Sequence, residues 1–180
     1  STSTVAGLST TQAMALTTAQ LAAFSNNQIG SLTETAVAKL STTQVAALNV
    51  LQVGALTTAA VKAMSTDQVK ALTVNQFKSL STGALAVLTT AQVGAVTTAQ
   101  AAVLNAKSVA ARSTATVAAL TSTQGKAMSN EAVTALNTDQ VKALSTAVVA
   151  SLTSAQVSLL SSAEVALLST GQIKALDTAQ

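Results

Sequence analysis

Residues 88–96 are L-T-T-A-Q-V-G-A-V, and residues 97–104 continue at once with T-T-A-Q-A-A-V-L. Cut in eights from Ser1, the 180-residue chain gives 22 complete octads and a four-residue remainder in the same phase. We number the octads from 1 to 22 and letter their positions a to h, as in S-T-T-Q-V-A-A-L for residues 41–48. A fixed period is the sequence signature of a repeat architecture. The octad is therefore the unit that decides the fold.

Each octad begins with a helix-start signal. Position a is Ser, Thr, Asn or Asp in all 23 occurrences, and position d is Gln or Glu in 15 of them. The first group caps the free N–H groups of a helix, and a Gln or Glu three residues later completes a capping box. The pattern predicts N-caps that include Ser41, Thr57, Ser65, Thr89, Thr97 and Asn137. It predicts capping-box partners that include Gln44, Gln68, Gln92, Gln100 and Gln140.

Apolar side chains recur at positions e and h. If position a is the N-cap, these two positions on either side of it form a hydrophobic staple, which fixes how the chain enters the helix. The predicted core therefore includes Val45, Leu48, Val69, Leu72, Val93, Val141 and Leu144. All six acidic residues fall at positions a to d and eight of the nine basic residues at f to h, which suits the dipole of one short helix per octad.

A single long helix does not fit this period. Eight residues advance a helix by about 800°, so an apolar stripe drifts by about 80° per octad and no one partner covers it. A helix that ends within each octad is too short to be stable alone, and its stability must come from neighbouring coils. The sequence predicts an all-α solenoid, a superhelix of very short helices with one per octad.

A β-solenoid is the alternative, because Val and Thr favour strands. The spacing between e and h, three residues and then five, breaks the alternation that a strand needs. Odd and even octads do not differ, so we expect equivalent environments and two to four octads per superhelical turn. We expect residues 1–180 to be a single array of 22 octads and a half octad, a fragment of a longer array.

Three residues depart from the repeat. Arg112 occupies the core position h, and Lys107 at position c lies in the same octad. The pair could form a small anion site, but we expect the Arg112 guanidinium to reach the surface along its alkyl chain or to mark a looser joint. Gly125 at position e removes a core side chain, and we expect a local packing defect, with Met128 as filler, in place of a ligand pocket.

The composition excludes most kinds of chemistry. The chain has no His, Cys, Trp or Tyr, so thiolate and imidazole metal sites and Ser-His-Asp catalysis are absent. We predict no enzyme, no cofactor and no metal. The net charge of +3 is too dilute for a nucleic-acid surface, and polar residues interrupt every octad, so we expect neither a nucleic-acid partner nor a membrane span.

The phrases L-T-T-A-Q-V-G-A-V (88–96), L-S-T-T-Q-V-A-A-L (40–48) and L-N-T-D-Q-V-K-A-L (136–144) resemble the LTTAQ-type octapeptide arrays of large proteobacterial surface and secreted proteins. Those proteins are labelled adhesins, RTX-like proteins or haem-utilisation proteins. The resemblance implies an extracellular spacer, stalk or filament-forming segment whose partner is itself, through neighbouring repeats and end-to-end or lateral association. The alternative is an extended binding surface for glycan, a host surface or, more remotely, ice, built from the Thr and Ser rows.

Overall fold

The computed structural model describes residues 1–176 and Gln180. Within them the chain forms short α-helices and no strand, one helix per octad, so the predicted all-α solenoid is confirmed and the β-solenoid is wrong. The chain divides into two compact units, residues 1–88 and 89–180. Unit 1 contains α1 (Thr2–Ala6), α2 (Thr10–Ala15), α3 (Thr18–Ala23), α4 (Asn26–Gly30), α5 (Glu34–Lys39), α6 (Thr42–Ala47), α7 (Val50–Gly54), α8 (Thr58–Ala63), α9 (Thr66–Ala71), α10 (Val74–Ser79) and α11 (Thr82–Ala86). Unit 2 contains α12 (Thr90–Ala95), α13 (Thr98–Ala102), α14 (Ala106–Ala110), α15 (Thr114–Ala118), α16 (Ser122–Ala127), α17 (Asn130–Thr134), α18 (Thr138–Ala143), α19 (Thr146–Ser151), α20 (Ser154–Val157), α21 (Ser162–Ala166) and α22 (Thr170–Ala175).

Two extended residues turn the chain after each helix that ends at position g, such as α6. After α6, Leu48 at position h has φ −65° and ψ 141°, and Asn49 at position a has φ −78° and ψ 167°. The carbonyl oxygen of Asn49 then accepts the first bond of the next helix, from the N–H of Val53 at 3.0 Å. No residue of the described chain has a positive φ, so the corner needs neither Gly nor Pro. An ordinary capping residue is enough to end one helix and start the next.

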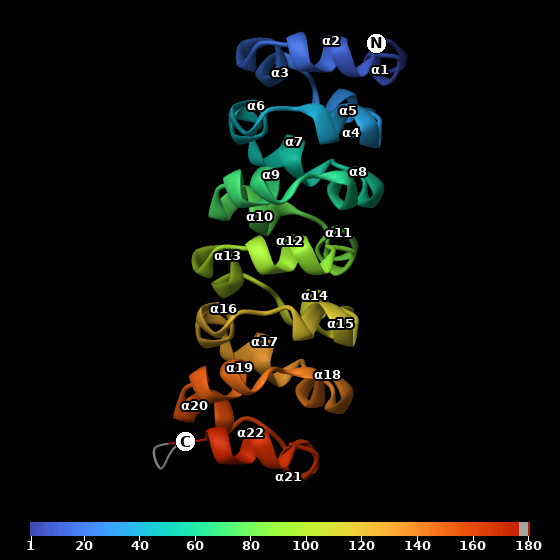
Figure 1. Ribbon diagram of the computed structural model, residues 1–180. Coiled ribbons are helices and arrows are strands. Elements are labelled where there is room, and N and C mark those ends of the chain that lie inside the picture. The colour runs from blue at the N-terminus through green and yellow to red at the C-terminus, as the bar shows by residue number, and fades with distance from the viewer. Residues whose placement is uncertain (177–179) are drawn as a thin grey trace. The chain divides into compact units, whose positions relative to one another are not determined.

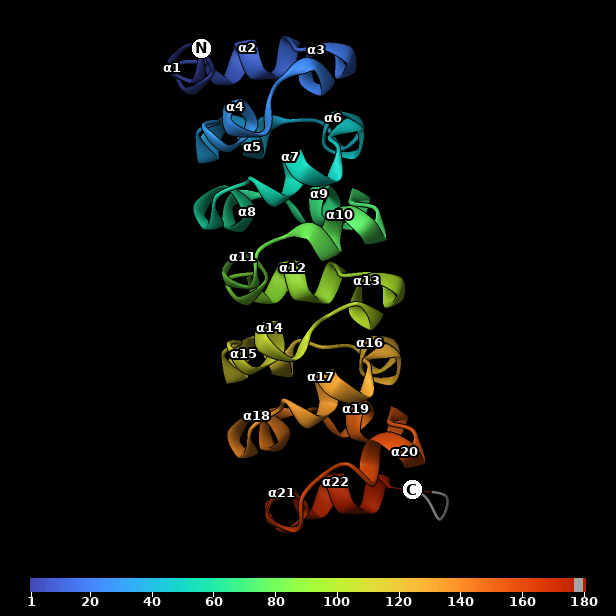
Figure 2. The same ribbon diagram turned by 180° about the vertical axis from the view of Figure 1, so that it is seen from behind.

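Three octads make one turn of the coil. In unit 1, α2, α5, α8 and α11 pack in one column, α1, α4, α7 and α10 in a second, and α3, α6 and α9 in a third (Figure 1). Unit 2 repeats the arrangement with α12, α15, α18 and α21, with α13, α16, α19 and α22, and with α14, α17 and α20 (Figure 2). Each helix therefore packs against the helices 24 residues before and after it in its unit, within the two to four octads expected.

The interior of each unit contains position d as well as the predicted positions e and h. In octad 7, for example, Gln52 and Val53 are fully buried and Leu56 is 5% exposed. Isolated helices of five or six residues are unstable in water, so burial of these three positions between coils is what stabilises them. The sequence predicted two of the three core positions and missed the polar one.

Candidate functional site

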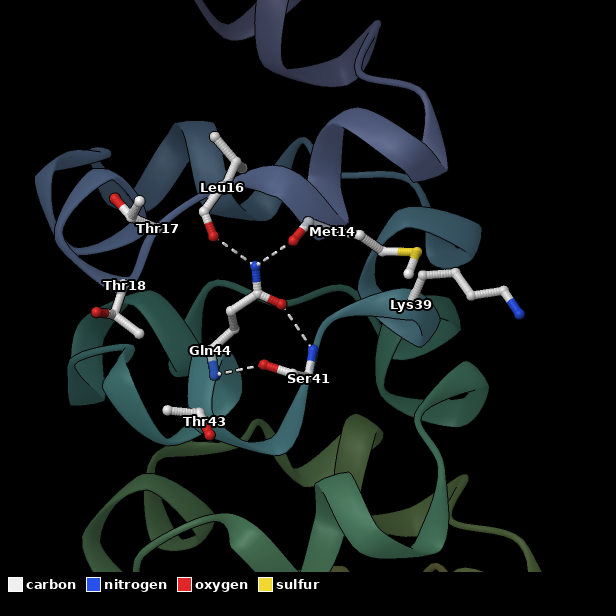
Figure 3. Close-up of a pocket in the computed structure, with 8 residues that line it drawn as sticks. All are labelled: Met14, Leu16, Thr17, Thr18, Lys39, Ser41, Thr43 and Gln44. Carbon is white, nitrogen blue, oxygen red and sulfur yellow. Dashed lines mark hydrogen bonds between the residues drawn. The ribbon is translucent and has the colours of Figure 1, made fainter.

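The buried position-d glutamines join each coil to the one before it. Gln44 illustrates the arrangement (Figure 3): its Oε1 accepts the N–H of Ser41 at 2.7 Å, and its own N–H donates to the Ser41 Oγ at 3.1 Å. Its Nε2 donates to the carbonyl oxygens of Met14 at 3.2 Å and Leu16 at 2.6 Å, at the end of α2. One amide group thus completes the start of its own helix and caps the end of a helix four octads earlier.

The same contact recurs through both units at the same sequence offsets. In unit 1 the Nε2 of Gln68 donates to the carbonyl oxygens of Val37 at 2.8 Å and Leu40 at 2.6 Å. In unit 2 the Nε2 of Gln124 donates to those of Val93 at 2.8 Å and Val96 at 2.5 Å. We call this contact, from Nε2 to carbonyls 31 and 28 residues earlier, the glutamine bridge. Bridges are made within a unit by Gln44, Gln52, Gln68, Gln76, Gln124, Gln140, Gln156 and Gln172.

The burial of the bridging glutamines makes their hydrogen bonds important for stability. Gln52, Gln68, Gln124 and Gln140 are each no more than 2% exposed, so any polar atom left without a partner there would carry the full cost of its desolvation. The last carbonyls of a helix have no partner within it and need a donor from elsewhere. The glutamine side-chain amide offers an acceptor and a donor together. Glutamate offers the acceptor alone when ionised.

In each unit one column of helices lacks the bridge over most of its length. Position d is Ala36, Ala60 and Ala84 on α5, α8 and α11 of unit 1, and Ser108 and Ala132 on α14 and α17 of unit 2. In another column of unit 1 the backbones approach closely at glycine. A Cβ on Gly30 of α4 would lie 2.7 Å from the carbonyl oxygen of Ala55, and one on Gly54 would lie 3.1 Å from that of Ser79. The expectation that all octads occupy equivalent environments was therefore wrong.

The residues singled out in the sequence lie as follows. The N-cap side chains of Ser41, Thr57, Ser65, Thr89, Thr97 and Asn137 each accept a backbone N–H three residues later. Gln44, Gln68, Gln92, Gln100 and Gln140 each complete a capping box. Val45, Leu48, Val69, Leu72, Val93, Val141 and Leu144 are buried. Asp177, the position-a residue of the incomplete last octad, lies outside the described residues.

Arg112 does not reach the surface, so that expectation was wrong. The residue is 6% exposed, and its Nε and Nη1 are buried without a hydrogen-bond partner. Desolvation by burial lowers the pKa of the guanidinium from its ordinary value to about 10. Position h faces the interior of the coil, where the other octads place Leu, Met, Phe or Val, and this direction accounts for the burial of Arg112. Lys107 is exposed on α14, so only one of the two residues of the suggested anion site is buried.

Gly125 is not a packing defect, and Met128 is not its filler. A Cβ on Gly125 of α16 would lie 2.6 Å from the Cγ1 of Val148, which comes from position d of α19. Val148 is 1% exposed and occupies the position where most octads carry glutamine. The side chain of Val148 at position d thus fills the space that Gly125 leaves at position e one turn earlier. The sequence signal was available, because Val148 is the one position-d residue that is a large aliphatic.

One hollow on the surface lies at a glutamine bridge. The hollow around Gln44 has a volume of about 330 Å³ and is lined by Met14, Leu16, Thr17, Thr18, Lys39, Ser41, Thr43 and Gln44 (Figure 3). Its central amide is already engaged in the glutamine bridge. The described residues contain no cluster of three or more acidic, His or Cys side chains. No described helix combines the length and apolarity needed to cross a bilayer. The repeated, buried site of this chain is thus the glutamine bridge.

Fold and bridge together define an α-helical repeat protein. Two segments of the chain, residues 51–82 and 133–170, match the family model of the ALTTAQ repeat. The first lies in unit 1 and the second in unit 2, and together they cover less than half of the chain. The matches support a repeat family. A comparison with curated proteins finds no match to the chain.

Proposed function

We propose that the chain is a non-enzymatic structural repeat segment, a spacer, stalk or filament-forming rod in an extracellular bacterial surface protein. The observation that carries the proposal is the glutamine bridge, which repeats the same coil-to-coil contact within each unit. In such an assembly every added turn repeats the contacts of the previous turn, so length grows with repeat number. The ALTTAQ matches and the resemblance to surface-protein arrays support the same role.

Small-angle X-ray scattering tests the spacer. A compact globule of this length has a radius of gyration of about 16 Å. We expect a clearly larger value and an asymmetric distance distribution, with a molecular mass that stays constant on dilution for a monomeric spacer. A mass that grows with concentration would favour the filament. A radius of gyration near that of the globule would contradict both.

Cleavage of the array by added protease on intact cells that make the parent protein tests the extracellular location.

A second candidate function is an extended binding surface for glycan or a host surface. With three octads per turn, position b of one column repeats down each unit. In unit 1 it presents Thr18, Thr42 and Thr66 on α3, α6 and α9, and in unit 2 it presents Thr90, Thr114 and Thr138 on α12, α15 and α18. All but Thr66 are exposed. Glycan-array binding that is lost when Thr18, Thr42 and Thr66 are replaced by Val would support this function, and an array without hits would contradict it.

A further inference from the structure

Glu164 occupies a position at which most octads carry a glutamine. It occupies position d of octad 21, and the octads on either side carry the bridging residues Gln156 and Gln172. It completes its capping box with one oxygen only: Oε2 accepts the N–H of Ser161 at 2.7 Å and the Ser161 Oγ–H at 2.8 Å. Its Oε1 makes no hydrogen bond to the described residues. The carboxylate therefore performs the first task of the glutamine and lacks the donor for the second.

The sequence offsets of the neighbouring bridges identify the carbonyl oxygens that a glutamine at position 164 would bind. Gln156 donates to carbonyls 31, 30 and 28 residues earlier, at 3.2, 3.3 and 2.8 Å, and Gln172 uses the same offsets. From Glu164 these offsets lead to Val133, Thr134 and Leu136, at the end of α17. The helix α21 contacts α18 one turn earlier, as α18 contacts α15, and Gln140 of α18 makes its bridge to the end of α14. No side chain among the described residues donates to these three carbonyls.

The local chemistry favours a cation between these groups. A carboxylate and three carbonyl oxygens at a helix C-terminus are all acceptors, and the C-terminal dipole adds further negative potential. Glu164 is half-buried, whereas Gln156 and Gln172 are 2% and 3% exposed, so the ionised side chain keeps more contact with water than its neighbours. No ammonium or guanidinium group of the described residues forms an ion pair with it. The charged residues on α18, which packs against α21, are Asp139 and Lys142, and the charged residue on α17, whose end carries the three carbonyls, is Glu131.

We propose that Glu164 and the main-chain carbonyl oxygens of Val133, Thr134 and Leu136 bind a calcium ion, which replaces the glutamine amide as the link between octads 17 and 21. Calcium takes six to eight oxygen ligands in flexible geometry and accepts carboxylate, carbonyl and water together. Magnesium requires near-ideal octahedral geometry, which a helix end does not supply. Extracellular calcium modules bind with dissociation constants of about 10⁻⁴–10⁻³ M, the range that so few protein ligands allow.

Calcium titration of the full chain tests the proposal. We expect calorimetric binding of one calcium ion in the range of about 10⁻⁴–10⁻³ M, and a rise in Tm with millimolar calcium chloride that sodium chloride of equal ionic strength does not produce. Glu164→Gln should restore the glutamine bridge. This variant should be more stable than the parent chain without calcium and should not respond to calcium. Glu131→Gln is the matched control, because it removes the same charge from an exposed position and should keep the response.

Three results would overturn the proposal. The first is a parent chain that calcium neither binds nor stabilises. The second is a calcium response that persists in Glu164→Gln. The third is a parent chain that acid stabilises and calcium does not, because a protonated carboxyl would then be the donor to the three carbonyls. Hydrogen exchange locates the effect, since calcium should slow exchange in residues 161–168 of the parent chain and leave that segment of Glu164→Gln unchanged.

Discussion

At the scale of the residue, the amide of a single glutamine holds two helices at once. A comparison of Gln68 with Gln12 separates the contribution of the glutamine bridge from that of the capping box. Gln68 is 2% exposed and makes both the capping box and the bridge, whereas Gln12 is exposed and makes the capping box only. Among the described residues, Gln12 donates to no carbonyl of another octad. The difference between equivalent substitutions at the two sites therefore measures the bridge.

Gln68→Glu keeps the capping-box acceptor and removes the Nε2 donor. We expect a loss of about 1–3 kcal/mol in the free energy of unfolding at neutral pH, because a carboxylate would be buried against two carbonyl oxygens. Burial raises the folded-state pKa of such a carboxyl. The loss should therefore shrink below the unfolded-state pKa, where the neutral acid can donate, and grow as the pH rises through the folded-state value. Gln12→Glu should be nearly neutral in the same urea titrations, and equal losses at the two sites would contradict the bridge.

Arg112 provides a second prediction at this scale. Arg112→Leu restores the apolar residue usual at position h and removes two buried donors without partners, so we expect a gain of about 1–4 kcal/mol in the free energy of unfolding. The folded-state pKa is lowered to about 10, so the buried charge is destabilising below that pH and the cost fades as the pH rises toward the unfolded value. The advantage of the variant should accordingly narrow above pH 10. Lys107→Ala, which removes an exposed positive charge from the same octad, is the control and should change stability by less than about 0.5 kcal/mol.

Two glycines at position f predict opposite outcomes for the same change. In Gly30→Ala the new Cβ would lie 2.7 Å from the backbone oxygen of Ala55, so we expect a loss of about 1–3 kcal/mol. In Gly94→Ala the nearest of these atoms, the oxygen of Ala119, is 3.9 Å away. There the better helix propensity of Ala should stabilise the chain by about 0.5–1 kcal/mol. Thermal unfolding followed by circular dichroism distinguishes the two, and a stabilising Gly30→Ala would show that the coils do not approach as described.

At the scale of the element, helices 24 residues apart adapt to each other in pairs. The pair α16 and α19 shows this most clearly, because Val148 fills the space that Gly125 leaves. The helices α13 and α16, and the helices α19 and α22, are also packed one turn apart. Their residues at positions e and d are Ala101 with Gln124 and Val149 with Gln172. A change at position e of one helix is therefore felt first at position d of the helix one turn later.

A double-mutant cycle measures this pairing. Gly125→Val should cost about 1–3 kcal/mol because its side chain overlaps that of Val148, and Val148→Ala should also be destabilising because it leaves a cavity. In the double variant one side chain replaces the other, so the two losses should not add. We expect a coupling of about 0.5–3 kcal/mol in favour of the double variant. Strict additivity of the unfolding free energies would contradict direct contact between the two sites.

At the scale of the whole molecule, the repeat is predictable from sequence to the extent that its interactions are local. Capping and helix length depend on residues within one octad or the next, and the apolar residues at positions e and h mark Val45 and Leu48 as core, so these features were predictable. The bridge depends on residues 28 to 31 positions apart and could not be seen in one octad. Its trace was nevertheless present, because alanine or serine replaces glutamine at position d at intervals of three octads, in Ala36, Ala60, Ala84, Ser108 and Ala132.

The exceptions were harder to predict for physical reasons. A long side chain on a short helix usually reaches water, so the burial of Arg112 follows only from the inward direction of position h in the assembled coil. The space beside Gly125 is filled by a residue 23 positions later, a separation that has meaning only once the turn is known to contain three octads. Both exceptions therefore depend on the turn, which local patterns did not determine.

The most direct test of a three-octad turn held by glutamine bridges is a nuclear Overhauser measurement on the side-chain amide of Gln68. Its resonances can be assigned by their disappearance in Gln68→Glu. We predict contacts from these amide protons to Val37 and Leu40, and exchange with solvent much slower than that of the Gln12 side-chain amide. Contacts confined to octad 9, with exchange as fast as that of Gln12, would contradict the bridge and the turn together.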